Sequence, residues 1–316
     1  MTRFATRATL PPTHDTRERQ LADLARLASV GCRDVRIRIP WEDFVPRPGH
    51  VDEAARERLS EFAGGAASLG LRPHASLCGR RLPGWFIDER AFSDERRADR
   101  HWSFFVDEVV ASISDCVGGV IPFENPFGLL TRLEEVALNP DNPDMRRFFG
   151  AVGCVALLHR RTATLCEPLR VTCVLDRPAL LPVSQTPVFA ALPIEAARAL
   201  IDMMRDTDGT FTAGIDVSAH PLLASRNESA RWADLTFREA LNVAGELPSC
   251  RISVIGIPDH DEPDAVADFA QAAVGVVSAL DEAGVEVDMV WLGDHVRMPS
   301  ELFGSILPPS TAHDDN

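Results

Sequence analysis

An acid and an amide, Glu124 and Asn125, end an apolar run of strand character in the segment GGVIPFENPFG, residues 118–128. Pro126 follows at once and favours the end of the strand there. A carboxyl group at a strand end is a candidate general acid or base, and a neighbouring amide can bind or assist a polar substrate. Glu124 and Asn125 are therefore the candidate catalytic residues.

Polar and aromatic side chains also follow the other apolar runs. The candidate substrate-binding residues at these ends are Glu42, Arg80, Arg81, Asp176, His220, Asp259, Trp291 and Asp294. If the runs are parallel strands of one barrel, their carboxyl ends share a face and these side chains converge on a pocket. The alternative for any one of them is a solvated loop. Consecutive residues rarely direct all their side chains at one ion, so the Asp-His-Asp run at 259–261 predicts no metal site.

The elements that would position these residues follow a recurring pattern. A helical stretch ends at a glycine, two or three residues follow, and a β-rich run begins. Gly31, Gly70 and Gly284 occupy this place and fit the left-handed position after a helix. Amphipathic helices that alternate with short apolar strands indicate a parallel β/α architecture.

Eight strands are predicted, at 3–9, 34–39, 72–77, 118–123, 169–175, 210–217, 251–257 and 286–292. Helices are predicted between them, near 15–29, 52–68, 95–115, 143–165, 193–205, 229–245 and 263–282, with Asp52 as a candidate N-cap. This count favours a single (β/α)₈ TIM barrel over residues 1–306, with loops at 177–192 and 220–228 and a disordered tail at 307–316. A doubly wound sheet is the alternative, but no Gly-x-Gly-x-x-Gly follows the first strand.

The composition excludes several functions. The net charge of −15 argues against nucleic acid or an anionic membrane as a partner. All 32 basic residues are Arg, so no lysine is present to form a Schiff base. No apolar run is long enough to span a membrane, and the N-terminus lacks a secretory signal, so we expect a cytoplasmic protein. No cofactor motif or metal-binding cysteine pattern is present, and the expected partner is a small-molecule substrate.

The order of segments resembles family 1 glycoside hydrolases, the β-glucosidase family, from about residue 14 to about residue 300. GRRLPGWF lies where that family has His-Trp-Asp-Leu-Pro, FENP lies where it has Phe-Asn-Glu-Pro, and CRISVIGIP lies where it has the Thr-Glu-Asn-Gly strand. The resemblance implies a (β/α)₈ barrel. It also implies that Arg36 lies beside the family's nucleophile position, and that Trp41 follows the second strand near the substrate.

The departures from that family concern its catalytic pair. The acid/base position of the motif is Asn125 here, and Glu124 stands in the place of the amide. A shift of one residue turns a strand side chain to the other face, unless a bulge redirects it. The nucleophile position aligns with Gly256, and the sugar-binding His becomes Gly79. Arg36 then lacks the carboxylate it has in the family, and either Glu124 or an acidic group of a ligand could replace it.

Three functions remain open from the sequence. One is a barrel enzyme that has left glycoside hydrolysis for acid/base chemistry, namely dehydration, isomerisation or cyclisation of a polar, acidic small molecule in bacterial specialised metabolism. The second is a rewired, inverting glycosidase that uses Glu124 with Asp259 or Asp294. The third is a non-catalytic barrel that binds a ligand or a partner protein.

Overall fold

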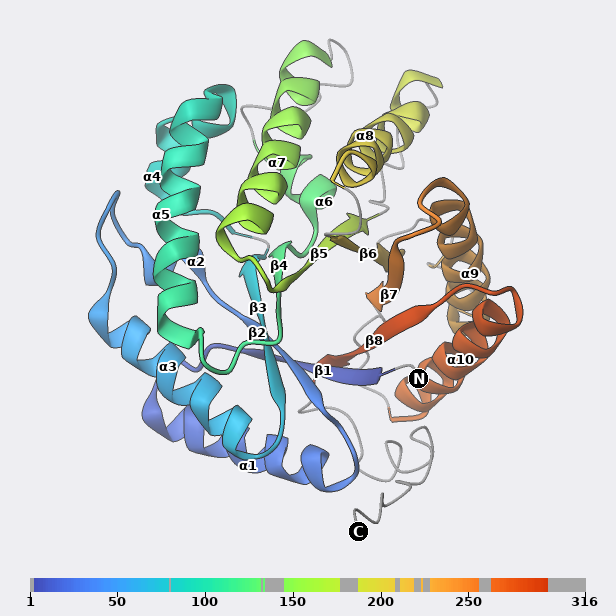
Figure 1. Cartoon of the computed structure of the whole chain (residues 1–316), viewed down its shortest axis with the longest axis horizontal. Helices are drawn as coiled ribbons and strands as arrows, with labels where there is room; N and C mark the ends of the chain where they lie inside the picture. The colour runs from blue at the N-terminus through green and yellow to red at the C-terminus, as the bar shows by residue number, and fades with distance from the viewer. Residues whose placement is uncertain are drawn as a thin grey trace.

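Eight parallel strands close into a barrel, with each strand hydrogen-bonded to its neighbours in chain order and β8 paired with β1 (Figure 1). The computed structural model describes residues 3–79, 81–131, 133, 145–176, 187–207, 211–218, 223, 228–255 and 263–294. The strands are β1 (Arg3–Thr9), β2 (Asp34–Arg38), β3 (Arg72–Cys78), β4 (Gly119–Phe123), β5 (Arg170–Asp176), β6 (Phe211–Asp216), β7 (Arg251–Ile255) and β8 (Val287–Asp294). The predicted (β/α)₈ barrel is confirmed.

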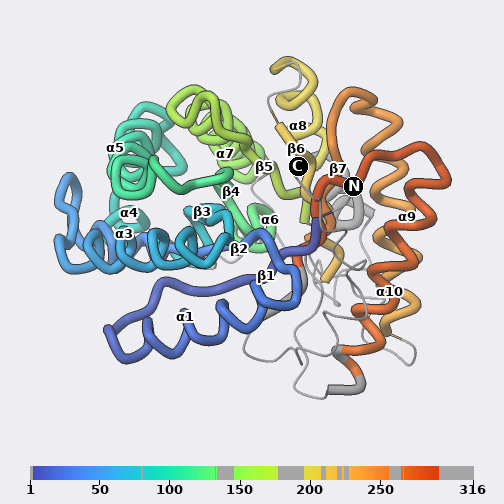
Figure 2. The backbone as a smooth tube through the Cα atoms, turned by 60° about the horizontal axis from the view of Figure 1, so that its bottom comes forward, coloured from blue at the N-terminus to red at the C-terminus, as the bar shows by residue number. Residues whose placement is uncertain are grey.

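Long helices follow the first seven strands and surround the barrel. They are α1 (His14–Ser29), α3 (Glu53–Ser68), α5 (Glu95–Ile113), α7 (Met145–Leu165), α8 (Pro187–Arg205), α9 (Glu228–Glu246) and α10 (Pro263–Glu282). Figure 2 shows α9 and α10 side by side along one flank, with α1 and α3 along another. Within the described ranges, none of the helices combines the length and the apolar character that a bilayer crossing requires.

Short helices lie in the loops at the carboxyl ends of the strands. They are α2 (Trp41–Phe44), α4 (Gly84–Asp88), the 3₁₀ helix η1 (Ala91–Ser93) and α6 (Pro126–Leu130). The sequence analysis did not predict them. It also placed residues 187–192 in a loop, whereas α8 already begins at Pro187, which is a favoured residue in a first helical turn. The tail predicted at 307–316 lies outside the described residues.

Local signals in the sequence explain where several helices begin and end. The Asp52 side chain accepts a hydrogen bond from the Ala55 amide at 2.7 Å, as predicted for an N-cap. Gly31, Gly70 and Gly284 have φ angles of 103°, 77° and 77°. This left-handed conformation suits glycine because it has no Cβ, and it turns the chain from each helix into the next strand.

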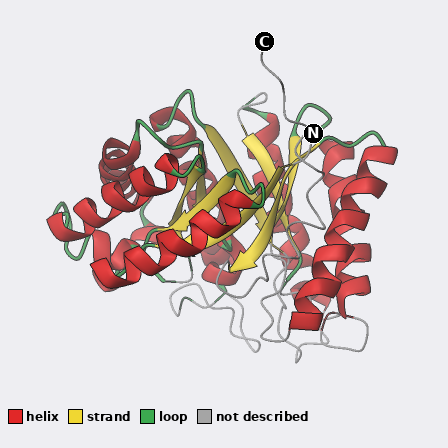
Figure 3. Ribbon diagram, turned by 90° about the horizontal axis from the view of Figure 1, so that it is seen from below, coloured by secondary structure: helices red, strands yellow, loops and turns green. Residues whose placement is uncertain are grey.

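Two apolar clusters occupy the two faces of the sheet. The large one lies between the strands and the helices, and it contains alternate strand residues such as Val35 and Ile37 of β2. The small one lies inside the barrel and consists of strand residues only, namely Ala5, Ile121, Val174, Ile255, Met289 and Trp291. Figure 3 shows the strands enclosed by the helices, with their arrowheads on one side. That side is where the active sites of such barrels lie.

A buried ionic network closes the opposite, N-terminal end of the barrel. Asp34 has no exposed surface, and its carboxylate accepts hydrogen bonds from Arg3 at 3.1 Å, from Arg72 at 3.0 Å and from the His74 ring at 2.8 Å. A buried carboxylate is tolerated when its charge and its lone pairs are matched in this way. The network therefore ties β1, β2 and β3 together where they enter the barrel.

We expect Asp34→Asn to lower the free energy of unfolding by about 3–5 kcal/mol, because it leaves buried cations without their carboxylate. Urea unfolding measures this loss. Asp234→Asn is the matched control: Asp234 is exposed and pairs with Arg238 one helical turn away, so its loss changes stability by at most about 0.5 kcal/mol. Equal effects of the two substitutions would contradict a structural role for the network.

Candidate functional site

The side chain of Glu124 points into the barrel because the alternation of faces breaks at Pro122. Ile121 belongs to the inner cluster, yet Phe123 faces outward and stacks on Trp102 of α5 at a ring distance of 4.7 Å. Strict alternation would place these two residues on the same face. The β3–β4 register pairs Ile121 with Ser76 and Phe123 with Cys78, and it skips Pro122, which has no N–H to donate. The side chain of Glu124 therefore points to the inner face of the barrel, although the acid/base position of the family motif is the next residue, Asn125.

Glu124 is held in a buried ion pair. Its Oε2 atom accepts from Arg38 Nε at 2.8 Å and lies 2.6 Å from Arg38 Nη2, while Oε1 accepts from the Ser76 hydroxyl at 2.8 Å. Burial alone would raise the pKa of Glu124, but the charges of Arg36 and Arg38 and the hydrogen bonds from Arg38 and Ser76 outweigh it. The pKa of Glu124 is therefore lowered, and the group is a carboxylate at neutral pH.

Gly79 makes room for this ion pair. A Cβ atom at residue 79 would lie 3.2 Å from Glu124 Oε2, 3.3 Å from Arg38 Nε and 3.4 Å from Arg38 Cδ. These contacts are tighter than ordinary van der Waals packing, and a longer side chain would need the space that Arg38 fills. The resemblance puts a sugar-binding His at residue 79. Here residue 79 is glycine, and the space beside it is filled by Arg38, which neutralises Glu124.

Arg36 lies deeper in the barrel than Arg38, on the same strand and face. Its Nε atom is 3.8 Å from Glu124 Oε1, which is too long for a hydrogen bond, and its guanidinium lies over the Trp291 ring at 5.6 Å. Burial lowers the pKa of Arg36 to about 10, with the charges of neighbouring arginines acting in the same direction. Arg36 remains cationic at neutral pH. The sequence left open whether Glu124 would be its partner; in the structure the closer partner of Glu124 is Arg38.

Asp176, at the end of β5, caps the helix that follows Glu124 and Asn125. Its two carboxylate oxygens accept from the backbone amides of Phe127 and Gly128, each at 2.9 Å. Burial raises the pKa of Asp176 to about 7, the nearby Asp216 adds to the rise, and the two amide hydrogen bonds oppose it. Asp176 is therefore both a helix cap and a group that exchanges its proton near neutral pH.

Asp216, at the end of β6, pairs in register with Asp176. Its Oδ1 atom accepts from the Ser218 amide at 2.9 Å. Burial raises its pKa and the charge of Glu124 adds to this, while the hydrogen bonds from Ser218 and the charge of Arg36 oppose it. The group that we call the mouth cluster consists of Arg36, Arg38, Glu124, Asp176 and Asp216. It combines two arginines, one carboxylate of lowered pKa and two carboxyl groups of raised pKa.

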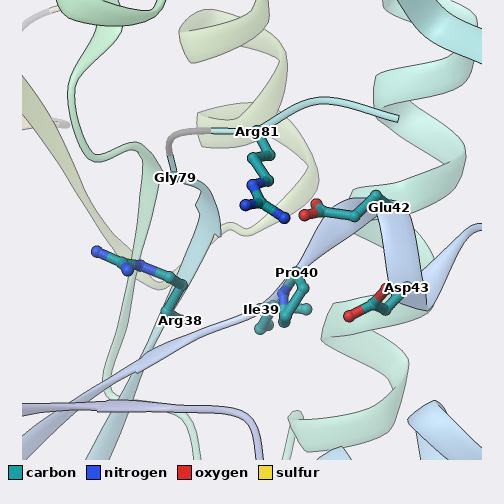
Figure 4. Close-up of a pocket in the computed structure, with 7 residues that line it drawn as sticks. All are labelled: Arg38, Ile39, Pro40, Glu42, Asp43, Gly79 and Arg81. Atoms are coloured by element: carbon teal, nitrogen blue, oxygen red, sulfur yellow. The ribbon is translucent and has the colours of Figure 1, made fainter. Parts of the chain in front are cut away.

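A pocket of about 340 Å³ adjoins the mouth cluster. Its lining residues are Arg38, Ile39, Pro40, Glu42, Asp43, Gly79 and Arg81 (Figure 4). In Figure 4 the side chains of Glu42 and Arg81 extend toward one another, and Arg38 extends to the other side, away from both acids. Two predicted binding residues, Glu42 and Arg81, thus line a pocket that carries charges of both signs.

The other predicted residues have different positions. The Asn125 side chain packs against Gly128, where a Cβ atom would lie 1.7 Å from its Oδ1 atom, so only glycine fits there. Trp291 faces the barrel interior beside Arg36. Trp41 is not in the mouth cluster: it is 1% exposed and packs against Trp85, Phe86, Trp102 and Phe105 behind the strands. Arg80, His220, Asp259 and the side chain of Asp294 lie outside the described residues.

Three members of the site were not among the predicted site residues. Asp216 lies within the strand predicted at 210–217, but nothing in the sequence indicated that its pKa would be raised. Arg38 could have been found from the period of two that places Asp34, Arg36 and Arg38 on one face of β2. Ser76 gives no comparable signal, because small polar residues are common in strands. In the described part of the chain, no three His, Cys, Asp or Glu side chains are grouped as a metal site.

The fold has known relatives in structure, although no family model and no curated protein matches the sequence. The AHE enzyme from Alicyclobacillus herbarius is 13% identical, with a TM-score of 0.69 over 97% of this chain and 98% of that one. A family 1 β-glucosidase from Thermotoga maritima is 12% identical, with a TM-score of 0.63 over 88% and 76%. A β-glycosidase from Pyrococcus horikoshii is 14% identical, with a TM-score of 0.65 over 93% and 84%.

The chain has the barrel fold of these proteins, two of which are β-glycosidases. The predicted resemblance to the β-glucosidase family is thereby confirmed at the level of the fold. At such low sequence identities the likeness concerns the fold alone, so the chemistry has to be argued from the mouth cluster.

The raised pKa values of Asp176 and Asp216 give contributions to stability that fall as the pH rises from about 4 to about 7, whereas buried His159, whose pKa is lowered to about 4, gives a contribution that rises over much of this range. In this window the folded state keeps the proton of Asp176, whose pKa is about 7, whereas the unfolded chain has released it near its ordinary value of 3.8. At Asp176 the unfolded state then binds fewer protons, so the contribution of this group to the free energy of unfolding decreases with pH and levels off above about 7.

Urea midpoints at intervals of about one pH unit measure this dependence. Asp176→Asn removes the falling contribution and is expected to make the slope more positive than in the wild type, and Asp202→Asn, an exposed residue paired with Arg205, is expected to leave it as in the wild type. A slope that Asp176→Asn leaves unchanged would contradict the raised pKa.

Proposed function

We propose that the protein is an enzyme that transfers protons to or from a polar, acidic small molecule at the carboxyl ends of the barrel strands. The observation that carries the proposal is the opposite shift of two pKa values within one cluster: the pKa of Glu124 is lowered and that of Asp216 is raised. Environments that separate the pKa values of neighbouring carboxyl groups are typical of acid/base catalysis, because one group then holds a proton while the other is ionised.

In this proposal Asp216 is the general acid. It is 8% exposed, and an amide bond to Ser218 fixes its orientation. Glu124 remains ionised and acts as the base or as the charge that stabilises a cationic intermediate. Arg38 and Arg81 favour a substrate with an acidic group, because guanidinium groups bind planar anions. The reaction class is dehydration, isomerisation or cyclisation.

Glu124 is poorly suited to the role of acid in a retaining glycosidase. That acid needs a raised pKa, and a second carboxylate must stand about 5–5.5 Å away as the nucleophile. Arg38, Arg36 and Ser76 all stabilise the ionised form of Glu124 instead. A rewired glycosidase, a non-catalytic barrel and a role in bacterial specialised metabolism remain predictions, and the first two are outcomes of the following test.

Asp216→Asn is expected to lower turnover by about 10²–10⁴-fold, the usual contribution of a general acid. The substrate source is a metabolite extract from a strain of the native host in which the gene has been deleted. Mass spectrometry follows the compounds that wild-type protein consumes, in water and in D₂O, so that loss of water or uptake of deuterium identifies the proton-transfer step. Asp234→Asn, an exposed residue with the same change of charge, is the matched control.

The outcomes separate the three functions. A compound consumed by wild type and by Asp234→Asn, but not by Asp216→Asn, supports the proposal. Release of a sugar from a glycoside would replace it with the rewired glycosidase. If the extract stays unchanged and one compound is retained by the protein, the barrel is a binding protein and the proposal is wrong.

A further inference from the structure

Arg36 is a buried cation, and two of its three guanidinium nitrogens make no hydrogen bond within the described residues. Its side chain is 6% exposed, and its Nε and Nη1 atoms have no hydrogen-bond partner among the described residues. Leaving a buried donor on a charged group unpaired is costly, and buried charges in proteins are almost always paired. The unpaired atoms therefore indicate a group that residues of the described ranges do not supply.

Glu124 does not supply that group. Its Oε1 atom is 3.8 Å from Arg36 Nε and already accepts the Ser76 hydroxyl, while Oε2 binds Arg38. Arg7, which is aligned with Arg36 in the β1–β2 register, adds a further positive charge that opposes the cationic form of Arg36. Arg36 and Arg38 thus face the single carboxylate of Glu124, whose two oxygens bind Ser76 and Arg38.

A second unused donor lies next to Arg36. The Trp291 side chain is buried in the inner cluster, and its Nε1 atom has no hydrogen-bond partner in the described ranges. The indole ring covers one face of the Arg36 guanidinium, with 5.6 Å between the guanidinium carbon and the ring centre, and His74 packs edge-on against the indole at 5.2 Å. Such a stack holds the guanidinium plane in place and leaves the donors at its edge for an acceptor.

We propose that the barrel interior beside Arg36 binds the carboxylate of a small-molecule ligand, with Trp291 Nε1 as a further donor. A carboxylate suits the site because it is planar, like the guanidinium edge, and carries a single charge. A doubly charged phosphate group would lose more hydration energy on entering so buried a site. That this ligand is the substrate of the enzyme rests on the proposed function. The existence of the anion site does not depend on the proposed function.

Sodium acetate is the probe, with sodium chloride and sodium sulfate at matched ionic strength as references. Thermal unfolding of the wild-type chain is followed at about pH 6.5 over a range of acetate concentrations, and the rise of the melting temperature gives the dissociation constant. Arg238→Met, which removes an exposed arginine, is the control for net charge. We expect saturable stabilisation by acetate in the wild type and in Arg238→Met, and none in Arg36→Met.

Arg36→Met also has an expected effect without acetate. It removes a charge that lowers the pKa of the buried Glu124, so the melting temperature in chloride is expected to fall. The proposal concerns the further rise that acetate produces: equal stabilisation of Arg36→Met and of the wild type by acetate overturns it.

Trp291→Phe provides a second test that does not depend on the folding of Arg36→Met. It keeps an aromatic face over Arg36 and removes the Nε1 donor, so acetate affinity is expected to fall by about two- to tenfold, the effect of one hydrogen bond. An unchanged affinity overturns the proposal, as does equal stabilisation by acetate, chloride and sulfate. Acetate binding by a protein that turns over no compound would contradict the proposed function and leave the anion site standing.

Discussion

The ion pair between Arg38 and Glu124 is the interaction on which the arrangement of the site depends. A carboxylate that is 7% exposed needs compensation for the hydration it loses, and Arg38 and Ser76 provide it through both oxygens. Pro122 breaks the alternation of β4 and so brings Glu124 to the inner face, and Gly79 leaves the space for Arg38. These sequence features act together, because each would be unfavourable without the others.

The barrel contains two buried ionic groups, and their difference indicates where function lies. At the N-terminal end, Asp34 is matched by Arg3, Arg72 and His74, and no atom of its carboxylate is left without a partner. At the other end, Arg36 keeps unused donors, and neighbouring carboxyl groups have raised pKa values. A buried charge without a partner lowers the stability of the folded state, and such unfavourable groups are generally found at functional sites.

The fold could be predicted from the sequence because its signals are local and repeated. Each glycine after a helix, each cap and each alternating strand is determined within a few residues, and together they indicate eight β/α units. The site was predicted less well. Arg38 is in reach of pattern analysis, but the direction of Glu124 depends on how β4 twists at Pro122. The pKa of Asp216 depends on burial and on the charges of Arg36 from β2 and Glu124 from the end of β4, which no local pattern contains.

Trp41 is a predicted site residue that the structure places away from the mouth cluster. The family resemblance predicts it near the substrate, yet α2, α4 and α5 enclose it in an aromatic cluster. A position in a motif identifies a place along the chain, whereas the exposure of the side chain is decided by the helices packed around it. The glycosidase fold is therefore compatible with a site whose charges differ from those of a glycosidase.

The central claim is that the pKa values of two carboxyl groups of one cluster are shifted in opposite directions, that of Asp216 upward and that of Glu124 downward. Carbon-13 NMR of the side-chain carboxyl groups, with Asp216→Asn and Glu124→Gln to assign the signals, measures it directly. We predict that Asp216 titrates above its ordinary value of 3.8 and that Glu124 titrates below its ordinary value of 4.5. An Asp216 signal that titrates at or below 3.8, or a Glu124 signal that titrates above 4.5, would contradict the account.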